Sequence, residues 1–321
     1  MKPTSAVLAV TYRCNSRCET CDIWKKDASS EIRADDFRRL PDGLRNINIS
    51  GGEPFLRDDL VEVVQVLREK YPKACLVIST NGLTPERIER EVRKMGRVGV
   101  RVSIDAVGAL NEEVRGVRGA FELAVETVDR LLALGLPDLG ISSTISHRTV
   151  GDLRKLKEMA ESRGIQFVTN LVHSSPTYFG EHDDKIPTKD ELERELIWLR
   201  ERELPSRRPK DWFRAYLTDG MIDQLAGKKR RIRCHAGRCL FFMSPDGDIY
   251  PCNIWPEKMG NILVESYEEM VARSERIFEE VDRCGVQCWM SCTVAPAMRR
   301  RPLGPALWVA KHKLSRRRSA A

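Results

Sequence analysis

Residues 46–80, NINISGGEPFLRDDLVEVVQVLREKYPKACLVIST, carry the pattern that decides the fold. A short β-type run opens the stretch, a longer amphipathic run follows it, and a second β-type run closes it. The apolar residues of the middle run have the spacing of one helix face: Leu60, Val63, Val64 and Leu67. A strand, a helix and a second strand in this order predict two parallel strands joined by a right-handed crossover.

The same alternation recurs along the first half of the chain. We predict six strands, at residues 7–11, 46–50, 75–80, 98–105, 141–145 and 166–172. Helical patterns such as TPERIEREVRKMG and GAFELAVETVDRLLALG separate them. Six units of roughly thirty residues each suit an incomplete (β/α) barrel or an open doubly wound sheet. The predicted fold class is α/β, and we favour a partial (β/α)6 barrel of the TIM type, followed by a cysteine-rich hairpin-plus-helix module.

Composition and charge limit the classes of function. The chain of 321 residues is 41% hydrophobic and 31% charged, as in globular proteins, and it has no apolar run long enough to span a bilayer. Residues 299–321 hold eight Lys/Arg and no acid, so removing eight from the net charge of +7 leaves −1 on residues 1–298. A nearly neutral body makes nucleic acid an unlikely partner. The basic end could contact an anionic membrane surface peripherally or remain a solvated tail.

The ten cysteines fall into two groups and one isolated residue. Three lie between residues 14 and 21 and six between residues 234 and 292, whereas Cys75 stands in an apolar run that predicts a core position. Short spacings in a large chain without a secretory signal point to metal ligation in a reducing cytosol, not to disulfides. We therefore expect a cytoplasmic protein.

The first group, Cys14, Cys18 and Cys21, leaves one corner of a four-ligand metal site open. A structural zinc ion binds four protein ligands, so one interpretation is a zinc site whose fourth ligand comes from a distant part of the chain. An iron–sulfur cube can take cysteines on three irons and leave the fourth iron to another ligand. The spacing C-x3-C-x2-C directly after the first predicted strand therefore favours a [4Fe–4S] cluster.

Together with NISGGEPFL at residues 48–56, these cysteines resemble the radical S-adenosylmethionine superfamily over roughly residues 5–175. The cysteines match the cluster motif of that family, and its glycine–glycine–glutamate motif is matched by Gly51, Gly52 and Glu53. The resemblance implies that S-adenosylmethionine chelates the free iron through its amino and carboxylate groups. It also implies that one electron from the cluster splits this cofactor into methionine and a 5′-deoxyadenosyl radical.

Polar residues follow the third and fourth predicted strands, where similar enzymes bind the ribose and carboxylate of S-adenosylmethionine. The cofactor-binding candidates that the resemblance gives are Gly51, Gly52, Glu53, Ser79, Asn81, Ser103, Asp105 and Arg115. Glu53 would accept from the amino group of the cofactor, and Arg115 would bind its carboxylate. The family often has an aromatic residue just before the third cysteine, where Thr20 stands here. Adenine packing is therefore expected from Trp24 or from a side chain of the sixth strand.

The second cysteine group begins with CHAGRCLFFMSPDGDIYPC, residues 234–252, which predicts a hairpin turning at residues 245–247. This stretch and the later cysteines resemble the auxiliary-cluster extension called the SPASM or twitch domain. The resemblance implies an auxiliary [4Fe–4S] cluster, with a zinc site as the alternative. The candidate ligands are Cys234, Cys252, Cys284, Cys288 and Cys292, and the sequence leaves open which of the last three bind.

Cys239 is left over from this ligand set. It is either a buried hairpin residue or a thiol that gives a hydrogen atom to a substrate radical, which makes it the candidate catalytic residue. The chain thus divides into a radical core at 1–180, a helical linker at 181–230, an auxiliary-cluster module at 231–296 and a basic tail at 297–321.

The predicted function is an enzyme that oxidises or dehydrogenates a small-molecule, sugar or lipid-linked substrate with help from the auxiliary cluster. It would need an external one-electron reductant of the flavodoxin or ferredoxin type. The first strand starts almost at residue 7, and the absence of a leader-binding domain before it favours a small substrate over a peptide. A radical epimerase or a peptide maturase with Cys239 as hydrogen donor is one alternative, and a non-catalytic iron–sulfur or zinc binding module is another.

Overall fold

The computed structural model describes residues 2–176, 178–181, 189–284, 286 and 288–319. Within them, the strands form a single sheet in the order β6-β5-β4-β3-β2-β1-β7-β8-β9. Six parallel strands make up its first part: β1 (Ser5–Ala9), β2 (Asn46–Ser50), β3 (Cys75–Thr80), β4 (Gly99–Ser103), β5 (Leu139–Ile145) and β6 (Gln166–Leu171). A doubly wound sheet reverses its strand order beside the first strand, whereas this order runs from β1 to β6 without reversal. The partial barrel is therefore confirmed.

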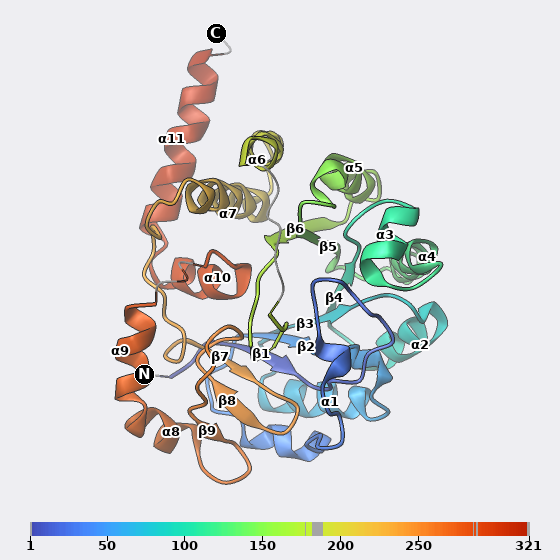
Figure 1. Ribbon diagram of the computed structural model, residues 1–321, viewed down its shortest axis with the longest axis vertical. Coiled ribbons are helices and arrows are strands. Elements are labelled where there is room, and N and C mark those ends of the chain that lie inside the picture. Colours follow the sequence, from blue (N-terminus) through green and yellow to red (C-terminus); the bar gives the residue numbers. More distant parts are fainter. Residues whose placement is uncertain (1, 177, 182–188, 285, 287, 320–321) are drawn as a thin grey trace.

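Helices follow the strands and lie along the outer side of the curved sheet (Figure 1). They are α1 (Leu60–Lys70), α2 (Pro85–Met95), α3 (Ala109–Arg115), α4 (Ala120–Ala133) and α5 (Leu153–Ser162). Short 3-10 turns occur at Ile23–Lys25, Ala34–Arg39, Pro54–Leu56 and Val150–Asp152. The four apolar residues predicted to form one face of α1 are all buried, so the helix packs on the sheet as its periodicity indicates.

The C-terminal half closes the open side of this arc (Figure 1). Its strands are β7 (Leu240–Met243), β8 (Asp248–Tyr250) and β9 (Gly260–Asn261). Its helices are α6 (Lys189–Glu203), α7 (Pro209–Leu225), α8 (Tyr267–Arg273), α9 (Glu275–Asp282), α10 (Ser291–Arg300) and α11 (Leu303–Ser319). The predicted hairpin is confirmed, because β7 and β8 pair in antiparallel register. β7 also pairs in parallel with β1, so the hairpin extends the sheet of the radical core.

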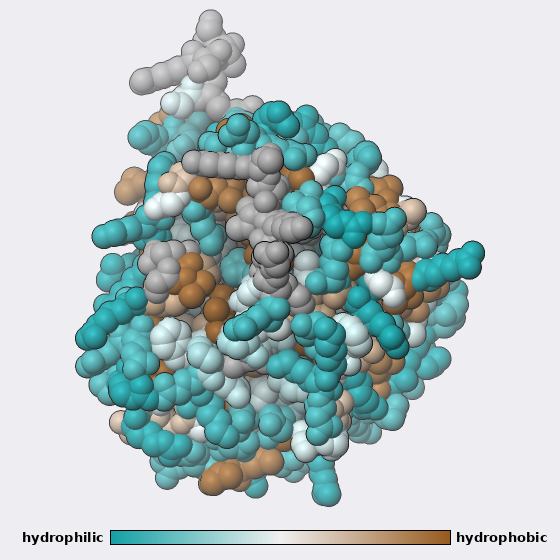
Figure 2. Space-filling view, in the orientation of Figure 1, coloured by the Kyte–Doolittle hydropathy of each residue, from teal (hydrophilic) through white to brown (hydrophobic). Residues whose placement is uncertain are grey.

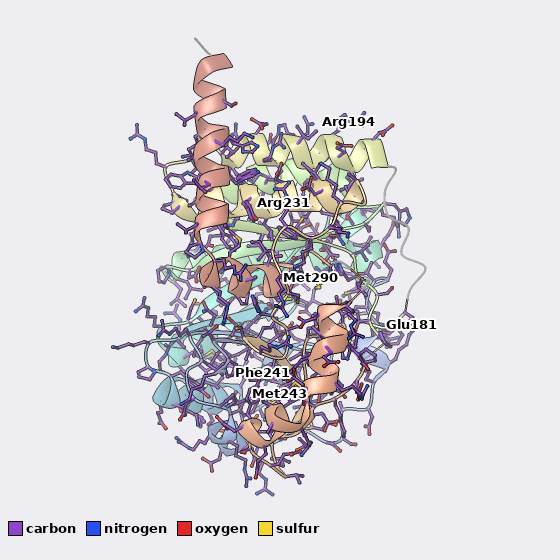
Figure 3. All side chains as sticks on the ribbon, turned by 90° about the vertical axis from the view of Figure 1, so that its left-hand side faces the viewer. Glu181, Arg194, Arg231, Phe241, Met243 and Met290 are labelled. Atoms are coloured by element: carbon purple, nitrogen blue, oxygen red, sulfur yellow. The ribbon has the colours of Figure 1, made fainter. Side chains whose placement is uncertain are left out.

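Strand β7 is buried on both faces, which ties the C-terminal half to the barrel. Phe241 and Met243, labelled in Figure 3, pack into the main core. Leu240 and Phe242 pack with Val7 of β1 in a second apolar cluster. The near-continuous apolar run LFFM is what a strand covered on both sides requires.

One sequence expectation needs correction. Cys75 is exposed, so its predicted core position is wrong. Burial alternates along β3, and Cys75 shares the less buried face with Ser79, at the amino end of the strand. Most of the basic end of the chain is helical, in α10 and α11, and the described residues of α11 are mostly exposed. Of the described helices, none is long and apolar enough to cross a membrane.

The buried carboxyl group of Glu203, at the end of α6, predicts a pH-dependent stability. Burial raises its pKa from 4.5 to about 8, although the charge of Lys157, with Nζ 3.7 Å from Oε1, partly opposes the shift. The folded state therefore holds this proton more tightly, and the free energy of unfolding falls as the pH rises from about 4.5 to about 8. We expect Glu203→Gln to remove a decline of a few kcal/mol, at roughly 1.4 kcal/mol per unit of pKa shift.

Chemical denaturation at pH 5 and pH 8.5 measures this difference. The matched control is Glu158→Gln, because Glu158 is exposed on the neighbouring α5. An equal pH dependence in the wild type and in Glu203→Gln would contradict the prediction.

Candidate active site

One cavity of about 310 Å³ lies within the arc of β1–β6 and reaches their carboxyl ends. It collects residues that are far apart in the sequence, as the carboxyl ends of barrel strands commonly do. The predicted site residues that line it are Cys14, Cys18, Cys21, Gly51, Gly52, Ser79, Asn81, Ser103, Asp105, Arg115 and Cys292. The candidates of the first cysteine group, of three strand ends and of α3 therefore meet at one place, with Cys292 from the second group beside them.

The loop with the first three cysteines is organised by Ser16, which the sequence analysis missed. The backbone N–H of Ser16 donates to Cys14 Sγ (3.4 Å), and its hydroxyl lies 3.3 Å from Cys18 Sγ. The same hydroxyl donates to the carbonyl of Arg115 at 2.9 Å. This buried serine thus fixes two thiols relative to each other and to the end of α3.

The thiols of this loop must lose their protons when they bind a metal. Burial raises the pKa of Cys14 to about 11 and that of Cys21 to about 12, so both are protonated at neutral pH until a metal displaces the protons. In the described part of the chain, no group of three or more Cys, His, Asp or Glu side chains is arranged to hold a single metal ion. Cluster cysteines bind different irons of one cube, and three of them leave the fourth iron open to another ligand.

Gly51 and Gly52 let the loop after β2 lie directly against the cysteine loop. A Cβ atom on Gly51 would stand 2.3 Å from the carbonyl oxygen of Thr11, and one on Gly52 would stand 2.3 Å from that of Arg13. The N–H groups of Gly52 and Glu53 donate to these two carbonyls, both at 2.8 Å. Only glycine permits this approach, and Gly51 also has a φ of +131°.

Gly52→Ala is therefore expected to push the two loops apart. The added methyl group meets backbone, which cannot rotate away, so we expect a loss of roughly 1–3 kcal/mol of unfolding free energy. Denaturant unfolding of the metal-free chain measures it. Gly151→Ala is the matched control, because its Cβ would have no neighbour within 4 Å. Equal stability losses in the two variants would refute the steric explanation.

Glu53 lies beside the loop that lines the cavity. It is fully buried and is absent from the lining of the cavity. Its carboxylate accepts hydrogen bonds from Phe55 N (3.1 Å), Thr80 Oγ1 (2.8 Å) and Asn81 N (2.6 Å), and burial raises its pKa to about 7. Glu53 thus ties the loop after β2 to the end of β3, and its direct contact with a cofactor stays a prediction.

Asp105 and Arg115, predicted as separate cofactor contacts, form an ion pair. Arg115 Nη2 lies 2.8 Å from Asp105 Oδ2, and Arg115 Nη1 donates to Cys18 Sγ at 3.8 Å. The other oxygen of Asp105 accepts from Thr144 N at 2.7 Å. Arg115 Nε is buried without a hydrogen-bond partner among the described residues, which leaves one donor for an acidic ligand group.

These residues fit the cofactor pair that the motifs imply. Three thiols, an arginine with an unused donor and the hydroxyls of Ser79 and Ser103 share one cavity. They match a cluster beside a ligand with carboxylate, amine and ribose groups. Trp24 also lines the cavity, and its indole Nε1 is buried without a hydrogen-bond partner among the described residues. Packing of the adenine on Trp24 remains a prediction.

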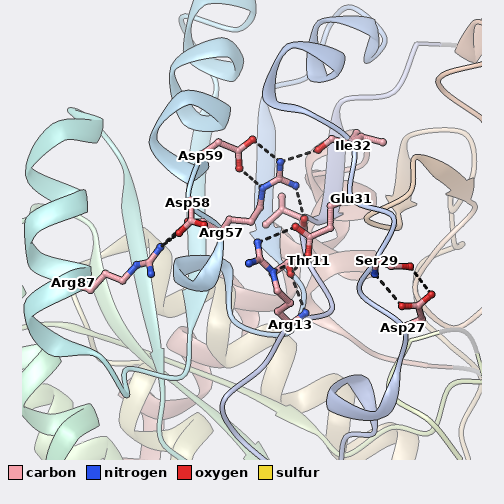
Figure 4. Close-up of polar contacts among 11 residues, drawn as sticks. Thr11, Arg13, Asp27, Ser29, Glu31, Ile32, Arg57, Asp58, Asp59 and Arg87 are labelled. Carbon is pink, nitrogen blue, oxygen red and sulfur yellow. Dashed lines mark hydrogen bonds and ion pairs between the residues drawn. The ribbon is translucent and has the colours of Figure 1, made fainter.

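A second layer of polar contacts holds the cysteine loop from outside (Figure 4). Arg57 is buried and donates to the carbonyls of Val10 (2.7 Å) and Ile32 (2.8 Å), and it is paired with Asp59 at 2.7 Å. Arg13 is paired with Glu31 at 3.1 Å. These contacts fix the chain on either side of the cluster motif, and no spacing rule pointed to them.

The C-terminal half supplies part of the cavity wall. Asn253, Met290 (Figure 3) and Cys292 line the cavity, and Ser291 N donates to Asn170 Oδ1 of β6 at 3.0 Å. Tyr178 also lines it, with its hydroxyl 3.0 Å from Ser50 Oγ. Tyr178 had no predicted role.

The second cysteine group surrounds its own cavity of about 240 Å³. The cysteines that line this cavity are Cys234, Cys252, Cys284 and Cys288. Burial raises the pKa of Cys292, and the nearby thiols of Cys288, Cys252 and Cys234 raise it further. Cys292 therefore lies close to this group, although it lines the first cavity. Arg230 Nη1 donates to Cys288 Sγ at 3.8 Å. Cys292 thus lies in the wall of the first cavity and near three thiols that line the second.

Cys239 lies elsewhere. It is buried just before β7, where Arg300 Nη1 donates to its sulfur at 3.3 Å, and it lines neither cavity. Since β7 runs parallel to β1, this position is at the amino ends of the strands, opposite the cavity mouth. The placement corresponds to the buried hairpin residue, and it gives no support to a hydrogen-donor role.

Comparison with known proteins identifies the class. Residues 8–162 match the model of the family described as the Radical SAM superfamily, and this part of the chain is a radical SAM domain. The family implies a [4Fe–4S] cluster and S-adenosylmethionine as cofactors. The chain is 28% identical over 295 residues to the mycofactocin maturase MftC of Mycobacterium tuberculosis (strain CDC 1551 / Oshkosh), covering 87% of this chain and 72% of the maturase.

Other similar proteins span much of the chain. The AdoMet-dependent heme synthase of Methanosarcina barkeri (strain Fusaro / DSM 804) is 28% identical over 307 residues, covering 86% of each chain. Among solved structures, Streptococcus suis SuiB bound to S-adenosylmethionine aligns with a TM-score of 0.67 at 15% identity, over 89% of this chain and 71% of SuiB. This structural likeness confirms the fold.

Proposed function

We propose that this chain is a radical enzyme that modifies a peptide. The relatives favour this alternative over the small-molecule, sugar or lipid-linked substrate that we expected first. MftC is named a mycofactocin maturase, and a solved structure of SuiB holds the precursor peptide SuiA. The chain is also 23% identical over 284 residues to the subtilosin biosynthesis protein AlbA of Bacillus subtilis (strain 168), covering 84% of this chain and 59% of AlbA. Nothing in the comparisons supports a membrane contact.

The observation that carries the radical chemistry is the convergence of three thiols, the glycine pair and the polar strand ends on one cavity. Cys14, Cys18 and Cys21 would hold the cluster, with Ser16 setting the geometry of their loop. Arg115 and the hydroxyls of Ser79 and Ser103 would orient the cofactor. When bound and given one electron by a flavodoxin- or ferredoxin-type reductant, cluster and cofactor supply a 5′-deoxyadenosyl radical that takes one hydrogen atom from the peptide.

The second cysteine group is proposed to hold an auxiliary cluster through Cys234, Cys252, Cys288 and Cys292. Cys292 is the fourth ligand in this proposal because its thiol lies near the other three. Loss of one electron and one proton from the peptide, after the hydrogen atom has left, completes a two-electron oxidation. Cys292 in the cavity wall would place an electron acceptor next to the peptide.

A second candidate is modification of an iron porphyrin. The heme synthase relative has the same identity as the maturase, and the alignment covers 86% of its length against 72% of MftC. An iron porphyrin is therefore the competing substrate in the test of the proposal.

The test is anaerobic turnover with S-adenosylmethionine and dithionite, after reconstitution with iron and sulfide. Peptides of mixed sequence with one residue type deuterated at a time are compared with Fe-coproporphyrin III. We expect deuterium from one peptide set to appear in 5′-deoxyadenosine, detected by mass spectrometry. Conversion of the porphyrin without peptide turnover would favour the second candidate, and no 5′-deoxyadenosine under any condition would overturn the radical function.

A further inference from the structure

Helix α11 carries an apolar strip that the rest of the protein leaves uncovered. Leu303, Leu307 and Leu314 are 77%, 70% and 59% exposed, and Ala310 is also exposed. Successive separations of four, three and four residues place all four side chains on one narrow face of a helix. Such a face is typical of a helix that packs against another helical segment.

We call these four residues the leucine strip. Another face of α11 packs against α7 and holds the helix in place. Trp308 packs edge-on against Tyr216 of α7, with ring centroids 5.4 Å apart, and its indole N–H donates to Asp219 Oδ2 at 3.0 Å. His312 stacks on Trp308 at a centroid distance of 4.0 Å. The inner face thus docks on α7, while the leucine strip stays exposed. Figure 1 shows α11 extending beyond α6 and α7.

A basic groove of about 870 Å³ adjoins the leucine strip at Leu303. Its charged lining residues are Arg200, Lys228, Arg231, Arg233, Arg300 and Arg301, with Asp219 and Asp223. Six cations thus face two acids of the lining, and two acids outside it, Asp282 and Glu201, pair with Arg233 (2.6 Å) and Arg200 (3.1 Å). Both acids of the lining are already paired, Asp219 with Arg200 (2.5 Å) and Arg231 (2.6 Å), and Asp223 with Lys228 (2.9 Å). Figure 3 labels Arg231, in the layer of α6 and α7 beside α11. The groove therefore retains a positive excess.

We propose that the leucine strip and the basic groove form a docking surface for an acidic amphipathic segment of the substrate peptide. The proposal rests on the proposed peptide-modifying function. Leucine side chains of the segment would pack on α11, and its carboxylates would face the cations of the groove. Holding one part of a peptide there raises the effective concentration of the rest at the cavity.

Charge and shape favour this occupant over the others. A second copy of the chain would bring another helix with eight Lys/Arg and no acid in residues 299–321, so like charges would meet. A nucleic acid matches the cations but offers nothing apolar to the leucine strip. A flat anionic membrane could meet the exposed leucines, but a bilayer does not follow a groove between α7 and α11, as a peptide chain does.

The binding test uses the full chain without reductant or S-adenosylmethionine. The probe is a fluorescent synthetic helix with leucine at three- and four-residue spacing and glutamate elsewhere, beside its lysine counterpart. Anisotropy should show binding of the glutamate helix only, weakened by added salt. Leu307→Ser with Leu314→Ser should lower its affinity at least about tenfold. Arg301→Glu should lower it more at low salt than at high salt.

Val264→Ser is the matched control, because Val264 is an apolar side chain, 83% exposed, before α8, and it should leave the affinity unchanged. Equal binding of the lysine helix, or unchanged binding by the leucine variants, would overturn the proposal. A dimer in light scattering that Leu307→Ser dissociates would assign the strip to self-association instead. Retention on anionic vesicles without helix binding would assign it to a membrane. Because no turnover is needed, failure of the peptide-modifying function would be seen separately in the deuterium experiment.

Discussion

Replacing Cys14, Cys18 and Cys21 together by alanine is expected to reduce the formation of 5′-deoxyadenosine to the level without enzyme. Apart from Cys292, these three are the only cysteines, among the described residues, that line the first cavity together with the Gly51–Gly52 loop. Without them no cluster can sit beside the cofactor, so no electron reaches its sulfonium. Chromatography of anaerobic, dithionite-reduced reactions measures the product.

Iron counting gives this experiment an independent reading. With two cubes the wild type should hold about eight irons per chain, and the triple variant should keep about four in the second cysteine group. Cys75→Ala is the control, because this exposed thiol lines neither cysteine cavity, and it should change neither value. Continued 5′-deoxyadenosine formation by the triple variant would show that the first cysteine group does not hold the reactive cluster.

Local periodicity was sufficient to predict the alternating strands and helices, although it left the partial barrel and the doubly wound sheet as alternatives. The strands at 46–50 and 75–80 agree residue for residue with β2 and β3, and the helix face of α1 is buried as predicted. Each of these elements depends on contacts close in the sequence. The parallel pairing of β7 with β1 joins residues more than two hundred positions apart, and no hairpin pattern carries that information. The sequence therefore predicted a separate module where the structure has one continuous sheet.

The candidate site shows the same division. Spacing and strand ends predicted the residues of the cavity lining, because parallel strands bring their carboxyl ends together whatever their sequence distance. Spacing could not predict that Asp105 and Arg115 pair with each other, or that Glu53 is buried outside the cavity lining. Those facts depend on side-chain directions. Ser16 offers the one local signal that was available, since a small polar residue between two cysteines can hydrogen-bond both thiols.

Cys239 shows that a cysteine without a predicted cluster role need not be catalytic. A thiol without a cluster role in the sequence invited a catalytic assignment, although burial was the simpler explanation. Its position beside Arg300 and before β7 follows from strand direction, which the pattern of the hairpin alone does not give.

Serine substitution at Cys252 is expected to separate the two halves of the chemistry. Cys252 lies in the second cavity, where burial raises its pKa to about 12, and its nearest titratable neighbours include Cys288 and Cys234. A serine there should cost the auxiliary cluster and about four irons per chain. We expect cleavage of S-adenosylmethionine to persist while formation of modified peptide falls at least about a hundredfold, since the electron acceptor is lost. Cys239→Ser is the control and should keep both iron and product.

The same assay decides between the last two candidate ligands. Cys292→Ser should lose the auxiliary iron and Cys284→Ser should retain it, because Cys292 lies near Cys288, Cys252 and Cys234 together. Iron content and electron paramagnetic resonance of the reduced protein measure both variants. The reverse result would make Cys284, which also lines the second cavity, the fourth ligand. Cys292 would then be a thiol in the wall of the first cavity, where it could exchange a hydrogen atom with the peptide. Cys239 does not line this cavity and could not do so.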